Sequence, residues 1–421
     1  MTPKTLLILL LVLALSSGAT STAGVPDSLI TWKGEVRVRG EIDGRDFQNS
    51  TPPNRFALLR TRIGAEIRPA SDVVVLIQLQ DARVFGQPLF TGSANTTADF
   101  KNIDLHQGFF QVLNFLTPGF GVALGRMELS YGNERIVGAS DWQNTGRAFD
   151  AALFRYEHRG HSVDLFTSDV VDHSLPPSPV TRSSVSGMSN EGFLFSGLHY
   201  TNRVIEDHTI NLYGFHEWSQ QDTSTGEVDR SRITLGGLFQ GTYAGFTYDA
   251  EGAYQLGKQS SVNISAFMVL GSLGYSFRAV PLTVVAGFEH LSGSPVGSTK
   301  VKAFHAPFAT GHKAFGDMDY FTNIPLQTFG RGLEDMYVRV SLKPVESLTI
   351  AVKAHNFRFA EEYVGRTKLG QELDVVVTWV YDMFVLFELG GGGFIPEKVL
   401  EFAYGGEDPG LWGYCTARVR F

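Results

Sequence analysis

The chain has 421 residues, of which 12% are aromatic and 46 are glycine, and its formal net charge is −8. The negative balance argues against a general nucleic-acid-binding protein, and the single cysteine, Cys415, excludes an intramolecular disulfide. Abundant glycine and aromatic residues are typical of closely approaching strands with aromatic girdles.

The N-terminal residues have the pattern of a secretory signal peptide. Lys4 provides a positive start, an apolar run covers Leu6 to Leu15, and the small residues Ser21 and Ala23 suit the −3 and −1 positions of a cleavage site. The apolar run is too short to cross a bilayer as a helix. We therefore expect residues 1–23 to be a signal peptide.

The rest of the chain, residues 24–421, alternates apolar and polar residues in many segments, as strands do when their successive side chains point to opposite faces. About eighteen such segments are present, each close to the length of a transmembrane strand. They lie near residues 32–43, 55–68, 73–84, 103–115, 120–129, 147–158, 161–171, 192–203, 208–218, 230–241, 244–256, 263–277, 282–292, 332–343, 346–358, 370–380, 383–394 and 410–421. The final segment ends in Phe421, a common end for an outer-membrane barrel.

The connections between these segments alternate between short and long. The long ones cover roughly 44–54, 85–102, 130–146, 172–191, 219–229, 293–331, 359–369 and 395–409. Short periplasmic turns and long external loops are typical of transmembrane barrels. We therefore predict an all-β fold, a single antiparallel transmembrane β-barrel with both termini in the periplasm. The rival, a soluble β-sandwich or β-helix, would have to bury many charged side chains.

The alternation also predicts which side chains face the lumen. In the first strand Val36 and Val38 face lipid, whereas Arg37 and Arg39 face inward. The complete set of predicted inward cations is Arg37, Arg39, Arg60, Arg62, Arg126, Arg339, Lys353, Arg418 and Arg420. Arginine-lined pores favour anions, because each guanidinium grips a carboxylate with a planar fork of donors. The alternative is structural, since lumen arginines also pair with carboxylates on neighbouring strands and stiffen the wall.

One segment carries a family resemblance. Residues 125–150 read GRMELSYGNERIVGASDWQNTGRAFD. The motif residues are Gly125-Arg126, Tyr131-Gly132, Arg135, Asp141-Trp142-Gln143-Asn144 and Arg147-Ala148-Phe149-Asp150. This pattern resembles the bacterial alginate-export family of outer-membrane barrels. Weaker matches follow at residues 312–319 and 332–335, and again at residues 369–374 and 394–396.

The resemblance implies an eighteen-stranded barrel in the bacterial outer membrane that exports a polyuronate through an electropositive lumen. Carried over by motif, Arg126, Arg135, Arg147 and Asp150 would lie in or near the constriction. Alternatively, segment 130–146 folds inward and these side chains serve to pack it. The implied partners are lipid, an anionic carbohydrate and a periplasmic synthesis or export partner; we expect a monomer and no cofactor.

The sequence departs from the family near its C-terminal end. Members are thought to carry a long periplasmic plug there, but the turn around Tyr381-Asp382 is short. We therefore expect the longest external loop, residues 293–331, to constrict the pore instead.

Two other functions compete with polymer export. A general porin, or an uptake porin for sugars or anions, would have the same pattern. An outer-membrane hydrolase would need a catalytic arrangement, and Ser186, Ser189 and His290 form none that we recognise. A metal site is not expected either, because His305 and His312 lie in a loop without strong metal-ligand spacing.

Overall fold

The computed structural model describes residues 29–85, 103–170, 193–219, 229–404 and 406–421, so the predicted signal peptide lies outside the described residues. The strands are β1 (Ile30–Gly44), β2 (Asn54–Ala70), β3 (Val73–Phe85), β4 (Asp104–Val112), β5 (Phe120–Met127), β6 (Phe149–His158), β7 (His161–Val170), β8 (Phe193–Asn202), β9 (His208–Ser219), β10 (Arg230–Tyr243), β11 (Phe246–Gln259), β12 (Val262–Ser276), β13 (Leu282–Leu291), β14 (Leu333–Val345), β15 (Leu348–Tyr363), β16 (Arg366–Val380), β17 (Val385–Pro396) and β18 (Gly410–Arg420).

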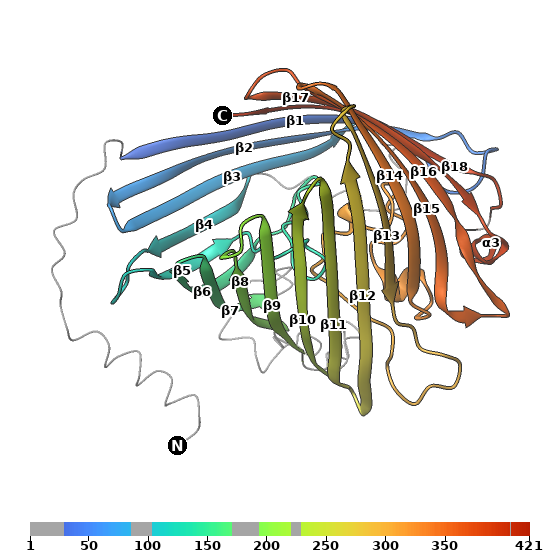
Figure 1. Cartoon of the computed structure of the whole chain (residues 1–421), viewed down its shortest axis with the longest axis horizontal. Coiled ribbons are helices and arrows are strands. Elements are labelled where there is room, and N and C mark those ends of the chain that lie inside the picture. Colours follow the sequence, from blue (N-terminus) through green and yellow to red (C-terminus); the bar gives the residue numbers. More distant parts are fainter. Residues whose placement is uncertain (1–28, 86–102, 171–192, 220–228, 405) are drawn as a thin grey trace, which may run out of the picture.

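The strands close into a barrel. Within the described residues, the sheet has eighteen strands, each paired antiparallel with its neighbour in sequence, and β18 pairs with β1 (Figure 1). Closure leaves no unpaired sheet edge, so every strand can satisfy its backbone hydrogen bonds within a membrane. The predicted fold and every predicted strand are therefore confirmed.

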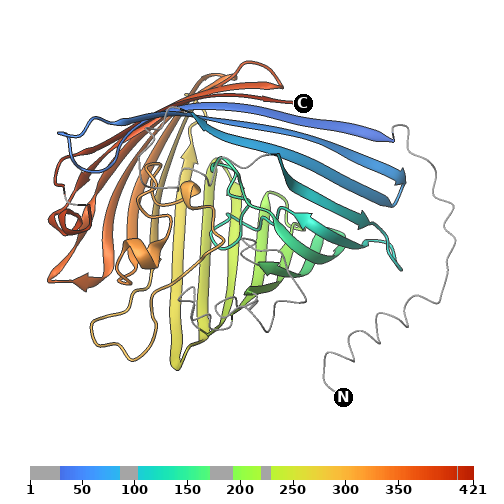
Figure 2. The same cartoon turned by 180° about the vertical axis from the view of Figure 1, so that it is seen from behind.

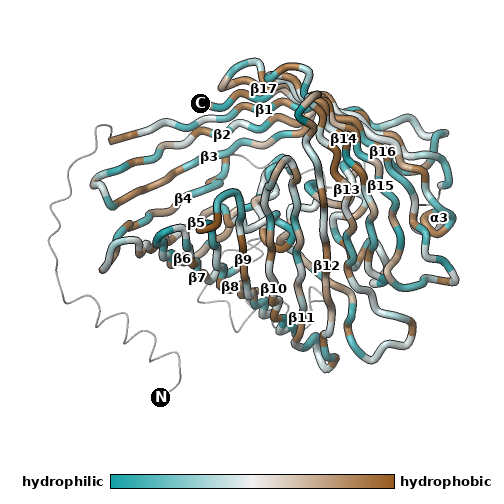
Figure 3. The backbone as a smooth tube through the Cα atoms, in the orientation of Figure 1, coloured by the Kyte–Doolittle hydropathy of each residue, from teal (hydrophilic) through white to brown (hydrophobic). Residues whose placement is uncertain are grey.

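The outer surface is apolar because of the two-residue period. On β1, Val36 and Val38 are 40% and 45% exposed, whereas Arg37 and Arg39 are buried. The hydropathy colouring alternates in the same way along the strands (Figure 3). The apolar face is directed outward, as expected for a lipid-facing wall.

Tight turns join many neighbouring strands at the end of the barrel opposite the long loops. Between β6 and β7, Arg159 and Gly160 have φ of 47° and 83°, the left-handed pair that a two-residue hairpin requires. One predicted long connection, residues 359–369, is wrong. There β15 and β16 continue to a two-residue turn at 364–365, because Val364 and Gly365 also adopt positive φ.

In the described part of the chain, the helices are short pieces within the long loops: η3 (Gly311–Lys313), α2 (Ile324–Gln327) and α3 (Lys398–Tyr404). Among the described residues, no helix is long and apolar enough to cross a membrane.

Two long loops enter the barrel. The first inner loop covers residues 128–148, between β5 and β6, and the second inner loop covers residues 292–332, between β13 and β14. Figure 2 shows the second inner loop, in orange, inside the ring of strands. Its side chains Phe304, Met318 and Phe321 are almost fully buried, and Phe321 packs on Phe357 and Phe394 of the wall. An apolar core therefore fills part of the lumen.

Candidate channel lining and inner loops

An arginine wall lines one side of the lumen. We give this name to Arg37, Arg39, Arg60, Arg62, Arg418 and Arg420, which lie on the inner face of β1, β2 and β18. The strand register places Arg37 opposite both Arg60 and Arg418. Arg60 is fully buried, and the side chain of Arg420 is 48% exposed.

Two glutamates of β1 neutralise part of this wall. Glu35 accepts hydrogen bonds from Arg60 at 2.7 Å and from Arg420 at 2.6 Å, and Glu41 accepts one from Arg39 at 2.7 Å. The structural alternative considered from the sequence therefore holds for these contacts. It does not account for the whole wall, because the arginines outnumber the two glutamates.

The first inner loop supplies a further carboxylate, that of Asp141. One oxygen accepts a hydrogen bond from Arg60 Nη2 at 2.6 Å, and the other accepts one from Arg420 Nη2 at 2.9 Å. Arg62 Nη1 lies 3.5 Å from Asp141 Oδ1. Partial burial opposes ionisation of Asp141, but the arginine charges outweigh it and hold its pKa well below the ordinary value.

Backbone carbonyl groups of the same loop take up other arginine donors. Arg37 donates to the carbonyl oxygens of Asp141 at 2.6 Å and of Gln143 at 3.0 Å. Arg39 donates to Trp142 O at 2.8 Å. Carbonyl groups inside the barrel need such donors, because an unpaired buried polar group is costly. The wall thus holds the loop through both its side chain and its backbone.

The Trp142 side chain joins the two inner loops. The guanidinium of Arg39 lies 3.8 Å from the centre of one of its rings. The ring of His312, from the second inner loop, stacks on Trp142 with centroids 3.7 Å apart and an interplanar angle of 6°. His312 in turn bonds Asp319 at 2.9 Å. The indole therefore lies at the junction of the arginine wall and both loops.

Arg147 provides a second link between the loops. Its guanidinium donates to Gly138 O in the first inner loop and to Phe308 O and Ala309 O in the second. Burial lowers the pKa of Arg147 below its ordinary value. These contacts agree with the alternative interpretation, in which Arg147 packs the inner loops.

Strands β16 and β15, two and three strands away from β18, bind the second inner loop with reversed polarity. Glu372 on β16 accepts a hydrogen bond from Met318 N at 3.0 Å, and Asp374 accepts one from Asp317 N at 3.4 Å. Lys353 on β15 donates to the carboxylate of Asp317. Arginines thus hold the carbonyl groups of one loop, and carboxylates hold the amide groups of the other.

Open space remains beside these contacts. A cavity of about 620 Å³ has both cationic and anionic side chains. It is lined by Gly132, Asn133, Arg135, Trp142, Asp249, His312, Lys313, Asp317, Tyr337, Lys353, Val376, Glu388 and Tyr414. A second cavity, of about 390 Å³, lies on the other side of Trp142 and is bordered by Arg39, Arg45 and Trp412. Trp142 and its loop therefore separate two parts of the lumen.

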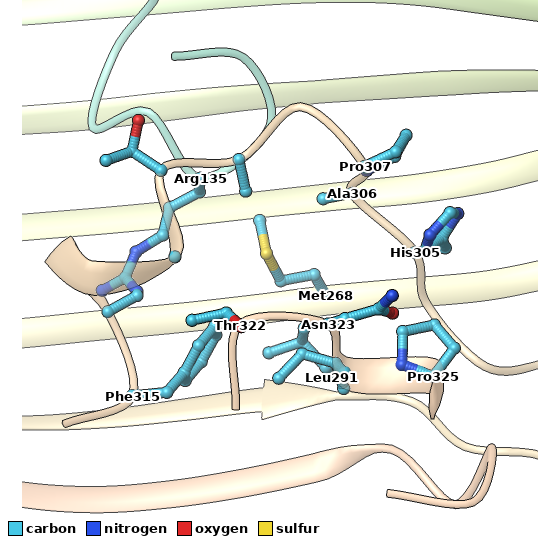
Figure 4. Close-up of a pocket in the computed structure, with 15 residues that line it drawn as sticks. Arg135, Met268, Leu291, His305, Ala306, Pro307, Phe315, Thr322, Asn323 and Pro325 are labelled. Carbon is cyan, nitrogen blue, oxygen red and sulfur yellow. The ribbon is translucent and has the colours of Figure 1, made fainter. Parts of the chain in front are cut away.

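A smaller cavity of about 160 Å³ lies between the second inner loop and strands β12 and β13. Figure 4 shows Met268 and Leu291 of these strands within it, with Arg135 at one side and His305 at the other. Arg135 pairs with Glu289 of β13, and its guanidinium lies 5.2 Å from the Phe315 ring. Arg135 thus lies inside the barrel, where it borders this cavity and the largest one.

Arg126 and Asp150 are not in the lumen, which corrects our prediction from the sequence. They pair with each other at 3.0 Å across β5 and β6. Their strand positions alternate with the buried inner residues Ala123, Met127 and Phe149. This pair therefore lies on the outward face near the long-loop end. The first inner loop packs on the inner face of β5, so this face is apolar. A polar side chain on β5 was therefore no sign of the inward direction.

The remaining predicted cations lie inside the barrel. Arg339 on β14 is exposed, and its Nε donates to Ser341 Oγ at 3.2 Å. Lys353 on β15 lies opposite Arg339 in the strand register. Asp141 and Trp142 were not predicted as site residues, although the Asp-Trp-x-Asn motif that carried the resemblance contained them.

Two acidic side chains inside the barrel, Glu128 and Glu134, have structural partners. Glu128 contacts His106 at 2.8 Å and Arg62 at 3.5 Å, and Glu134 contacts Lys313 at 2.5 Å. Across the described ranges, no group of three or more His, Cys, Asp or Glu side chains is arranged to hold a metal ion. Ser186 and Ser189 lie outside the described residues.

The comparisons with known proteins agree with this architecture. The sequence matches the family described as Alginate export over residues 29–402. The chain belongs to the alginate export family. A search of curated proteins finds no match to it. Membership and the eighteen-stranded barrel identify it as a channel of the bacterial outer membrane.

Solved porin structures share the fold of this alginate export family member. Acinetobacter baumannii OccAB4 aligns with a TM-score of 0.64 and 8% identity, over 94% of this chain and 98% of the other. A BenF-like porin from Pseudomonas fluorescens Pf-5 aligns with a TM-score of 0.62 and 12% identity, over 94% and 100%. Pseudomonas aeruginosa OccK3 (OpdO) aligns with a TM-score of 0.60 and 11% identity, over 93% of this chain and 95% of the other. At these identities the likeness concerns the fold.

Proposed function

We propose that this channel passes an anionic polysaccharide, an alginate-like polyuronate, out of the periplasm. The observation that carries the proposal is the arginine wall, whose guanidinium groups outnumber the two glutamates beside them. The family's description supports the substrate class. Transport is passive, and the periplasmic machinery that makes the polymer supplies the direction.

The wall would lower the barrier for carboxylates by electrostatic attraction. A guanidinium stays charged at physiological pH and grips a carboxylate with a planar fork of donors. Several such groups along the lumen would let a polyanion move from one to the next. Other lumen carboxylates, such as Glu388 on β17 beside the 620 Å³ cavity, would keep it from binding too tightly to leave.

We assign the substrate path to lumen cations from both walls. The proposed lining residues are Arg37, Arg39, Arg60, Arg62, Arg135, Arg339, Lys353, Arg418 and Arg420. Arg126 and Asp150 are left out because they face outward, and Arg147 is assigned to holding the inner loops together. The barrel is proposed to work as a monomer, with a periplasmic partner that delivers the polymer.

The experiment is ion selectivity in planar bilayers, with a double variant Arg418→Gln and Arg420→Gln. The wild type should prefer chloride over potassium, and oligouronates should block its current. The double variant should lower the chloride-to-potassium permeability ratio by about twofold or more, because two lumen charges are lost. Arg126→Gln is the matched control, since it removes one arginine from the outward face and should leave the ratio unchanged. Potassium preference in the wild type would contradict the proposal.

A porin for small sugars or anions is the second candidate. The mixed charge of the 620 Å³ cavity favours it, because Arg135 and Lys353 face Asp249 and Glu388 there. Liposome flux assays separate the two functions. A general porin would pass neutral hexoses as fast as anionic ones of equal size, and oligouronates would not block it.

A further inference from the structure

The first inner loop has a base and a tip that are held by different forces. In the base, Leu129, Ile136 and Val137 are buried in the apolar core. The tip, residues 141–145, contacts the arginine wall through polar groups. Competing anions weaken such polar contacts but leave apolar packing intact. The polar contacts of the tip can therefore be released while the base stays in place, which leaves the Trp142 ring as its remaining contact with the wall.

The backbone changes direction at both ends of the tip. Ser140 has a φ of 51° and Gly146 a φ of 67°. At Gly146 a Cβ atom would lie 2.6 Å from Arg62 Nη2, so a larger residue would displace this arginine. Two left-handed positions that flank a short segment are suited to act as its hinges.

Asp141 occupies the place that a substrate carboxylate would take. Its two oxygens bind different strands of the wall, through Arg60 on β2 and Arg420 on β18. Glu35 contacts the same two arginines, but it belongs to β1 and cannot leave. Asp141 is thus a carboxylate ligand of the wall that belongs to a loop and not to a strand.

We propose that Asp141 is a specificity-determining residue of the channel, an internal carboxylate that the substrate must replace on the arginine wall before it can pass. The proposal rests on the proposed function. A monovalent anion can replace one carboxylate, but the carbonyl oxygens of Trp142, Gln143 and Thr145 still hold the tip. A polymer supplies several acceptors on one chain, and linked groups bind far better than separate ones. The tip thus selects anions with several carboxylates in a row.

The test compares Asp141→Asn with Asp150→Asn, a matched control on the outward face. Basal conductance and the blocking concentrations of monomeric and oligomeric uronate are measured in planar bilayers. The wild type should be blocked by the oligomer at a concentration about tenfold lower, per carboxylate, than by the monomer. Asp141→Asn should raise basal conductance and reduce this ratio several-fold, whereas Asp150→Asn should behave as the wild type.

A labelling experiment keeps the proposal testable if the conductance of Asp141→Asn is altered by misfolding. Asn144 is buried and donates to Arg83 O at 3.1 Å. Asn144→Cys, with Cys415→Ala to remove the native thiol, reports the release of the tip through its reaction with a membrane-impermeant maleimide. Oligouronate should speed labelling, and monomeric uronate at equal carboxylate concentration should not.

The outcomes separate this inference from the proposed function. If oligouronates block the wild type but neither conductance, blocking ratio nor labelling responds as described, the role of Asp141 is refuted and the transport function stands. If oligouronates neither block the wild type nor speed labelling, the proposed function and the substrate-driven role of Asp141 both fall.

Discussion

At the scale of single residues, the hydrogen-bond partners of an arginine explain why it can be buried. Arg60 is fully buried, yet it contacts two carboxylates and two carbonyl oxygens. Buried ions are tolerated only when paired and hydrogen-bonded. The sequence predicted the inward direction of this arginine from alternation alone, but three of its four partner groups belong to a loop more than seventy positions away.

Asp141 gives a prediction for pH. Its folded-state pKa is held below the ordinary aspartate value of about 4. A carboxylate with a depressed pKa contributes its full stabilisation above the ordinary value and loses it as the pH falls toward the folded value. Attachment of the tip should therefore be constant from neutral pH to about pH 5 and weaken below about pH 4.

The measurement is conductance between pH 7 and pH 3 for the wild type and Asp141→Asn. Glu35 and Glu128 are further carboxylates that contact these arginines, so only the difference between the two proteins reports Asp141. The wild type should gain conductance at low pH more steeply than the variant. Parallel curves would rule out this titration as the cause.

At the scale of elements, the inner loops determine the free cross-section of the lumen. The sequence predicted that residues 293–331 constrict the pore, and the structure places most of this segment inside the barrel (Figure 2). The sequence did not predict the apolar packing of Phe304 and Phe321 in the lumen. Apolar residues in a long loop have no periodic partner in sequence, so their burial shows only in three dimensions.

Removing the second inner loop should widen the channel. Ser294 N donates to Gly330 O at 2.8 Å, so a short Gly-Ser linker can replace residues 295–329 without straining the barrel. Single-channel conductance should rise about twofold or more, because this loop fills part of the lumen. Deletion of residues 296–299, an exposed tip with Val296 at 80% exposure, is the control. Equal conductance in both deletions would show that the loop does not limit the pore.

At the scale of the whole molecule, closure of the barrel gives the two faces of the sheet different surroundings, lipid outside and the lumen inside. Val38 on the outer face of β1 is 45% exposed and pairs with Leu59 and Ala417. Arginine at the middle of a lipid-facing wall costs about 2–4 kcal/mol. Val38→Arg should lower the free energy of unfolding in liposomes by that amount.

The matched control for this substitution is a lumen position. Thr378 on β16 faces Glu388, to which it donates at 3.1 Å. Thr378→Arg therefore places the same side chain in water beside a carboxylate and should change the free energy of unfolding little. A similar loss in both variants would show that the two faces do not differ as described.

The sequence by itself determined the barrel, the number of strands and the arginine wall. These follow from the two-residue period, which is local: each side chain's direction depends only on its neighbours along the strand. The orientation of Arg126 and Asp150 could not be predicted in this way, because the strand there is apolar on the inner face as well.

Only the tertiary structure shows which groups of the first inner loop the arginine wall binds. The carbonyl oxygens of Trp142 and Gln143 have no sequence signature, and their meeting with Arg37 and Arg39 depends on how a loop folds back across the lumen. Backbone acceptors are the same in every residue, so a pattern of side chains cannot show which of them an arginine will bind.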